Sequence, residues 1–251
     1  MIINIYIMIE SFNIYCLSHK NTERQNNIQN IFNKLNLNVI FYQGVGYDDD
    51  RIKNRNLDIH KSRCWSIMYG HLDMIQQFLN TDKEFGIFCE NDILIQKDFN
   101  VSLDEIINNF KELKLDILLL GYLCSNNIHG NFYNFQEKKV ILDSNFKYKY
   151  YDYDLREKAG VWGAQMYMLN RSHAKKILEI YSTKYADISI TDNTMIPFAT
   201  DWTITKCDVN RAIIFPIIAI ENNVGNLYED KFQQLARDGC HKLSYSGDYY
   251  S

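Results

Sequence analysis

The sequence has little of several features that mark particular classes of protein. None of its apolar runs approaches the roughly 18 residues that a membrane-spanning helix needs. Its apolar start, MIINIYIMIE, is short and has no basic segment, so we do not expect a signal peptide. Basic residues are not in excess either, because 27 Lys and Arg face 31 Asp and Glu, for a net charge of -4. This balance gives no support to a nucleic-acid-binding protein, which would carry a basic patch.

Cysteine and histidine patterns that hold metals or disulfide frameworks are also missing. The six cysteines are spread along the chain without a CxxC pair, and two of them, Cys16 and Cys89, lie in apolar runs. We therefore expect reduced, buried thiols and no disulfide framework. The six histidines show no zinc spacing. The chain has no GxxxxGK[ST] loop, and the turn Gly44-Val45-Gly46 lacks the remaining glycine of a dinucleotide fingerprint.

What the chain does have is the composition of a folded protein, with 46% hydrophobic and 23% charged residues over 251 positions. We expect one domain over residues 1–251, since we find no internal repeat and no linker. Residues 124–160 differ from the rest because they are polar and rich in aromatics, so we expect a long loop or insertion there. Loops of that length are usually functional or mobile.

Strand-like and helix-like patterns alternate along the chain, which indicates the α/β class. The first strand, the helix after it and the second strand favour a parallel pair joined by a right-handed crossover. Ser102 and Glu105 have the spacing of a capping box at the start of a helix. The expected strands are 12–18, 38–45, 85–95, 116–123, 162–170 and 212–220, and the expected helices are 21–37, 62–80, 102–113 and 172–181.

One expected strand, FGIFCENDILI at 85–95, is interrupted by Glu90-Asn91-Asp92. The interruption is either a turn between two short strands or a binding site, because buried charges must be paired or must hold a metal. On an extended backbone Glu90 and Asp92 would point the same way, about 6–7 Å apart. Carboxylates at the carboxyl end of a central strand lie where α/β sheets bind ligands. Such oxygen ligands suit Mg²⁺ or Mn²⁺ together with substrate phosphates.

Six stretches of the chain, in order, carry a resemblance to a known family. They are IYCLSHKNTER, CWSIMYGHLDMI, FCENDI, WGAQMYMLNRSHAKKIL and TDWTITK followed by FPIIAIE. Their order and spacing resemble glycosyltransferase family 25, the lipooligosaccharide and collagen galactosyltransferase group, and also proteins of this type in large DNA viruses. The resemblance covers roughly residues 12–225. The chain departs from the family pattern at Gly70, Asn91 and Ala164, where the family has Ser, an acid and Thr.

The resemblance implies a single-domain GT-A-like fold, with a Rossmann-like nucleotide-sugar-binding mixed sheet flanked by helices. It implies a UDP-sugar donor, Mn²⁺ or Mg²⁺, and a glycan or protein hydroxyl as acceptor, with inversion at the anomeric carbon. A metal would neutralise the charge that develops on the departing diphosphate. With no targeting signal in view we expect a cytoplasmic location, in the host cytoplasm or the virion if the gene is viral. Oligomeric state stays open.

The same resemblance implies roles for individual residues. Asp92 would be the direct metal ligand, with Glu90 supporting it or contacting the donor. Asp201 is the expected general base, with Asp192 as the alternative. Trp162, Gly163 and Gln165 would border the acceptor, since an indole offers a stacking face for a sugar. The residues expected to bind the donor and its metal are Ser18, Arg24, Gly46, His71, Glu90, Asn91 and Asp92.

Plainer interpretations stand beside these. His71 could be a packing residue of its helix, Asp201 a helix N-cap, and Trp162 part of the core. Asn91 and Ala164 also leave open a catalytically silent relative that binds sugar nucleotide or serves a structural role. A third possibility is another metal-dependent enzyme acting on phosphate esters. The chain contains neither an aspartyl nucleophile motif nor a phosphate loop to support that possibility.

Overall fold

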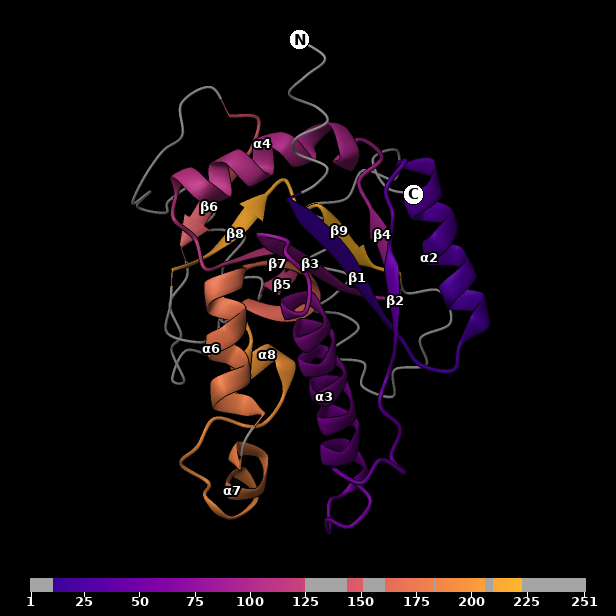
Figure 1. Ribbon diagram of the computed structural model, residues 1–251, viewed down its shortest axis with the longest axis vertical. Helices are drawn as coiled ribbons and strands as arrows, with labels where there is room; N and C mark the ends of the chain where they lie inside the picture. Colours follow the sequence, from indigo (N-terminus) through magenta and orange to yellow (C-terminus); the bar gives the residue numbers. More distant parts are fainter. Residues whose placement is uncertain (1–10, 125–143, 151–160, 183, 206–209, 223–251) are drawn as a thin grey trace.

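The computed structural model describes residues 11–124, 144–150, 161–182, 184–205 and 210–222. Within them the chain forms a nine-stranded mixed sheet flanked by helices (Figure 1). The expected α/β class with one mixed sheet is thereby confirmed, and it agrees with the GT-A-like architecture that the resemblance implies. No helix in the described part of the chain is long and apolar enough to cross a membrane.

The first half of the chain supplies the parallel part of the sheet. Strand β1 (Phe12–Ser18) pairs in parallel with β2 (Ile40–Gln43), and helix α2 (Thr22–Lys34) connects them, as the pattern predicts. On its other side β1 pairs in parallel with β3 (Phe85–Glu90). Helix α3 (Ile59–Leu79) precedes β3, and α4 (Phe99–Glu112) follows the short strand β4 (Ile93–Ile95).

The second half reverses direction beside β3. Strand β7 (Val161–Asn170) lies antiparallel between β3 and β5 (Ile117–Cys124). Beyond β5 come β8 (Arg211–Phe215), in parallel, and β6 (Lys147–Tyr150) at the far edge. Strand β9 (Ala219–Glu221) pairs with β4 and touches β5. Helices α6 (Arg171–Tyr181), α7 (Tyr185–Thr191) and α8 (Thr200–Thr203) complete the described elements.

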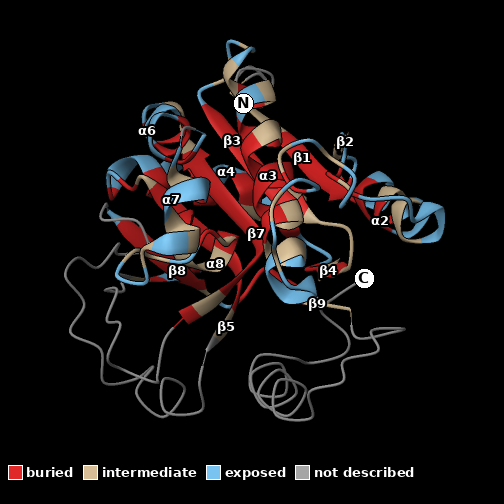
Figure 2. Ribbon diagram, turned by 90° about the horizontal axis from the view of Figure 1, so that it is seen from below, coloured by how far each residue is buried: buried red, intermediate tan, exposed pale blue. Residues whose placement is uncertain are grey.

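Two hydrophobic layers cover the two faces of the sheet. Alternate residues of each central strand enter opposite layers, so Tyr15 packs with α3 and α6 while Ile14 packs with α2 and α4. Buried residues fill the strands and the inner helix faces, and exposed residues lie on the outer helix faces (Figure 2). The described thiols Cys16, Cys64 and Cys89 are free, in agreement with the expected reduced cysteines.

The alternative of a turn between two short strands at 85–95 is confirmed, since β3 pairs with β1 and β7 while β4 pairs with β9. Two other local expectations are wrong. The expected strand 212–220 is also two, β8 and β9, because Pro216 between them has no N–H to give to a ladder. The capping box at Ser102 is not formed, because burial of Phe99 extends α4 toward its N-terminus and Asp98 becomes the N-cap.

The segment expected as a loop or insertion, 124–160, is only partly described. Within it, β6 forms an edge strand whose Tyr148 is buried and accepts a hydrogen bond from Asn109, with 3.0 Å between Nδ2 and Oη. Glu105 accepts hydrogen bonds from Ser144 and Asn145 at the start of this piece. Residues 125–143 and 151–160 lie outside the described residues.

The junction of β5 with β9 gives a test of the packing. A Cβ on Gly121 would lie 2.8 Å from the backbone oxygen of Ala219 and 3.3 Å from Cβ of Gln165. We expect Gly121→Ala to lower the free energy of unfolding by about 1–3 kcal/mol, because backbone cannot move aside as a side chain can. Denaturant unfolding measures this. The control is Val101→Ala, at a residue 78% exposed, and equal stabilities of the two variants would contradict the packing.

Candidate active site

Several polar residues meet at the edge of the sheet where the parallel strands end. Strands β1, β2 and β3 end there at Ser18, Gln43 and Glu90. Strand β7 runs antiparallel to β3, and the last pair between them joins Cys89 to Met166. The first residues of β7, Val161 to Gln165, therefore lie at this same edge. The chain after β9 also reaches it, since the backbone N–H of Asn222 donates to the carbonyl oxygen of Asp92 at 2.6 Å. This is the edge at which α/β sheets bind ligands.

The acidic interruption forms a turn at this edge, and its two carboxylates diverge. Strand β3 ends at Glu90, so the extended geometry that would point Glu90 and Asp92 the same way does not continue to Asp92. Glu90 lies toward His71 of α3, with 3.6 Å between Oε1 and Nε2. Asp92 lies toward Arg24 of α2, with 3.2 Å between Oδ2 and Nη1. Since α2 and α3 cover opposite faces of the sheet, each carboxylate contacts a different layer.

Asn91, between the two carboxylates, ties the turn to the neighbouring strand. Its Nδ2 donates to Oγ of Ser18, 3.0 Å away at the end of β1. The residue that replaces the family's central acid therefore contacts one of the other residues expected at the donor site. Ser18 is buried, with 4% of its surface exposed.

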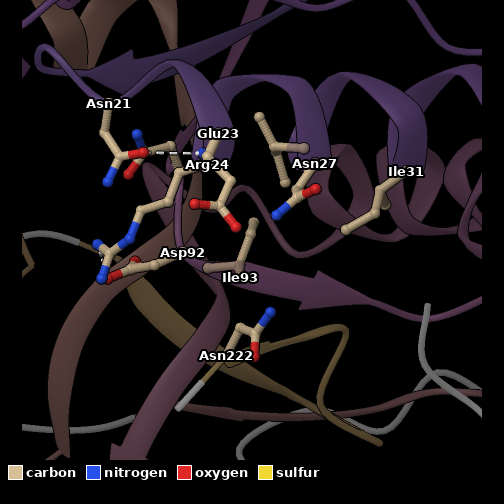
Figure 3. Close-up of a pocket in the computed structure, with 10 residues that line it drawn as sticks. Asn21, Glu23, Arg24, Asn27, Ile31, Asp92, Ile93 and Asn222 are labelled. Atoms are coloured by element: carbon tan, nitrogen blue, oxygen red, sulfur yellow. Dashed lines mark hydrogen bonds and ion pairs between the residues drawn. The ribbon is translucent and has the colours of Figure 1, made fainter. Parts of the chain in front are cut away.

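Asp92 and Arg24 border a pocket of about 260 Å³ between α2 and the β3–β4 turn (Figure 3). Four amides line it, those of Asn21, Asn27, Asn91 and Asn222, and Ile28, Ile31 and Ile93 supply an apolar part. Asn21 caps α2 by accepting a hydrogen bond from the backbone N–H of Arg24, which fixes the first turn of the helix beside the pocket. The pocket thus combines one cation, carboxylates and amides at a helix N-terminus.

Asp92 is the residue of this edge best suited to a divalent ion. Oδ1 of Asp92 is buried and has no hydrogen-bond partner in the described part of the chain, so it has the character of an open oxygen ligand. No group of three or more His, Cys, Asp or Glu among the described residues comes together to hold a metal. A Mg²⁺ or Mn²⁺ ion would therefore take Asp92 together with substrate phosphates and water, a coordination usual for these ions.

His71 is fully buried, so it does not form the wall of a ligand site. Its Nδ1 is 2.8 Å from the hydroxyl of Tyr167. Burial lowers the pKa of His71 to about 4, with the charge of Asp201 acting in the opposite direction. His71 is therefore neutral at neutral pH, and its contact with the acidic turn is with Glu90.

The residues expected at the acceptor side do come together. The backbone N–H of Gly163 donates to Oδ1 of Asp201 at 3.1 Å. Gly163 has φ +103°, a backbone conformation that favours glycine, and a Cβ there would also displace the side-chain amide of Gln165. The indoles of Trp162 and Trp202 pack edge to face, with 4.7 Å between the ring centroids. Asp201 lies in the first turn of α8, whose N-cap is Ala199, so it is not the N-cap.

Asp192 lies elsewhere. It ends α7, it is exposed, and its Oδ1 accepts hydrogen bonds from the backbone N–H and hydroxyl of Thr194. Among the described residues it has no recorded contact with the other expected site residues. In the described part of the chain, Asp201 and not Asp192 has a hydrogen bond with an expected acceptor-side residue, Gly163.

The comparison of the chain with known protein families decides its classification. The model of glycosyltransferase family 25, described as an LPS biosynthesis protein, matches residues 12–195. The chain belongs to this family. The matched range contains the acidic turn and β7 of this family 25 chain, while Asp201 lies just beyond it. No curated protein matches the chain significantly.

A solved structure is also similar to this family 25 chain. It is described as a glycosyltransferase involved in the glycosylation of the major capsid of PBCV-1. It is 9% identical in sequence, the match covers 68% of this chain and 67% of that one, and the TM-score is 0.34.

Reasoning from the sequence missed several residues at this edge of the family 25 chain. His19 follows β1 directly, and its Nδ1 lies 2.8 Å from the carbonyl oxygen of Gly44. Gly46, which was expected at the donor site, lies against the Asp48 side chain: a Cβ on Gly46 would be 2.3 Å from Oδ1 of Asp48. Trp202 and Asn222 were also missed. His19 and Trp202 each adjoin an expected residue, which is the signal that could have found them.

The contact between Ser18 and Asn91 gives a test of the turn. We expect Ser18→Ala and Asn91→Ala each to lower the free energy of unfolding by about 1 kcal/mol, because each removes a partly buried hydrogen bond. The double variant should lose less free energy of unfolding than the two single variants lose together, since the hydrogen bond is removed only once. Denaturant unfolding of the four proteins measures the coupling, and strict additivity would mean that the two side chains do not interact.

Proposed function

We propose that this family 25 protein transfers a sugar from a UDP-sugar to a hydroxyl group of a glycan or protein acceptor, with a divalent ion, Mn²⁺ or Mg²⁺, at Asp92. The observation that carries the proposal is the pairing of Asp92 with Arg24 beside the pocket, at the ligand-binding edge of the sheet. Arg24 offers a fixed fork of donors for diphosphate oxygens, close to the N-terminus of α2. Asp92 offers the unpartnered Oδ1 for the metal.

The acceptor side supplies the second half of the reaction. The acceptor oxygen bonds to the anomeric carbon as the bond to the UDP oxygen breaks, and Asp201 takes the proton of the acceptor hydroxyl. Attack from the face opposite UDP inverts the anomeric configuration. The metal, when bound, supplies charge stabilisation for the leaving diphosphate. Trp162 and Trp202 provide indole surface beside Asp201, which suits a sugar acceptor.

The first experiment measures UDP release from a panel of UDP-sugars, with and without Mn²⁺. We expect release that depends on the metal and that Asp92→Ala reduces by at least about 100-fold, because the variant loses the metal ligand. The control is Asp187→Ala, which also breaks an Asp–Arg ion pair but at α7, where Asp187 binds Arg55. Metal-independent release, or equal loss in both variants, would contradict the role of Asp92.

The role of Asp201 as general base is tested by replacing each of the two candidate carboxylates with its amide. Asp201→Asn can still accept the hydrogen bond from Gly163 through its amide oxygen but cannot take a proton. We expect it to lower kcat for transfer by about 100-fold, within the usual contribution of a general base. Asp192→Asn is the control and should leave kcat within about twofold. If instead Asp192→Asn abolishes transfer and Asp201→Asn does not, the assignment is reversed.

A catalytically silent relative is the second candidate, and one observation favours it. Asn91 stands where the family has an acid, so the turn carries one carboxylate fewer than the family pattern, and its amide donates a hydrogen bond to Ser18. Calorimetry separates the two candidates. Binding of UDP-sugar with no turnover, tested with a range of glycan acceptors, would favour the silent relative.

A further inference from the structure

Two polar side chains are buried inside the aromatic layer between α3 and the sheet. His71 and Tyr167 are both 0% exposed, and they contact each other through Nδ1 and the hydroxyl. The ring of Tyr167 stacks on one side of Phe88, with 5.3 Å between the ring centroids, and the ring of Tyr15 stacks on the other side, with 5.5 Å between the centroids. An apolar pair would fill this space without the cost of burying polar groups. Buried polar pairs of this kind need an explanation beyond packing.

The pair points toward the acidic turn. Nε2 of His71 is buried, has no hydrogen-bond partner in the described chain, and lies 3.6 Å from Oε1 of Glu90. That separation exceeds the length of an ordinary N–H···O hydrogen bond by about 0.4–0.9 Å. The Glu90 side chain is 29% exposed, so a small rotation of it can close the gap.

The chemistry of the three groups fixes the direction of the hydrogen bonds. An ionised carboxylate only accepts, so Nε2 must carry the proton if it is to hold Glu90. Nδ1 is then an acceptor, and the Tyr167 hydroxyl must donate to it. Burial raises the pKa of Tyr167 well above its ordinary value and lowers that of His71, so Tyr167 keeps its proton and the imidazole stays neutral.

We propose that Tyr167 and His71 are positioning residues for Glu90. The Tyr167 hydroxyl fixes the imidazole in the Nε2–H tautomer, and that N–H holds the Glu90 carboxylate on the α3 side of the turn, apart from the Asp92–Arg24 pair. Glu90 is thus held to contact the donor and not to share the metal with Asp92. The effect on catalysis rests on the proposed function, whereas the hydrogen-bond relay does not.

Tyr167→Phe and Tyr15→Phe form a matched pair. Each variant removes one hydroxyl from a fully buried ring that stacks on Phe88, but the hydroxyl of Tyr15 contacts Asn13 and not His71. We expect Tyr167→Phe to lower kcat/KM for the UDP-sugar by about tenfold, the usual effect of losing a group that orients a site residue. Tyr15→Phe should stay within about twofold. Equal effects in the two variants would overturn the proposal.

Rescue at His71 separates positioning from packing. His71→Gln places an amide N–H near the position of Nε2 and should keep most of the activity. His71→Leu fills similar space without a hydrogen-bond donor and should lower kcat/KM for the UDP-sugar by about tenfold. If Leu is as active as Gln while both remain folded, His71 has only a packing role.

A spectroscopic measurement tests the relay without any substrate. The ¹⁵N chemical shifts of an imidazole distinguish its protonated from its unprotonated nitrogen, and the His71 signals are assigned by their absence in His71→Gln. We expect the proton on Nε2 in the wild type and a shift toward Nδ1 in Tyr167→Phe, with Tyr15→Phe unchanged. A wild-type proton on Nδ1 overturns the relay. The expected spectra from a protein that releases no UDP would support the relay while the proposed function fails.

Discussion

The reversed direction of β7 is the constraint on which the site depends. Had β7 run parallel to β3, its first residues would lie at the opposite edge of the sheet, away from Glu90. Because it is antiparallel, Gly163 reaches the edge where β1 and β3 end, and the hydrogen bond from Gly163 brings Asp201 with it. The positive φ of Gly163 is part of this arrangement, since a side chain there would displace Gln165. The proposed donor side, on the parallel strands, and the proposed acceptor side, on β7, therefore share one edge.

The turn after β3 gives its two carboxylates different surroundings. Glu90 is the last residue of β3 and faces a neutral, buried imidazole, while Asp92 follows the turn and faces a guanidinium. Asn91 holds the turn to the end of β1 through its hydrogen bond to Ser18. An acid at position 91 would add a third negative charge close to the other two. The amide avoids that repulsion, and the hydroxyl of Ser18 accepts its N–H.

The sequence predicts the elements better than their pairing. Apolar runs and helical spacing locate β1, α3, β5 and β7 to within a few residues, because local periodicity reflects burial. The sequence could not show that 212–220 forms two strands, since their pairing depends on contacts with β5, roughly a hundred residues earlier. The same limit applies to the site. His71 and Tyr167 are 96 residues apart, and the divergence of Glu90 and Asp92 depends on where β3 stops, which the run FGIFCENDILI does not reveal.

The Arg24–Asp92 pair bears on the order in which ligands can bind. A metal ion alone would approach Asp92 against the positive charge of Arg24, and a diphosphate alone would approach Arg24 against the negative charge of Asp92. Both side chains are partly buried, with 31% of the Arg24 side chain and 14% of the Asp92 side chain exposed, so these repulsions are screened less than at an open surface. A metal–diphosphate complex meets both side chains with the opposite charge. Within the proposed function, the ion pair therefore disfavours either component alone and favours the complete donor, which limits occupation of the site by free cations or free phosphates.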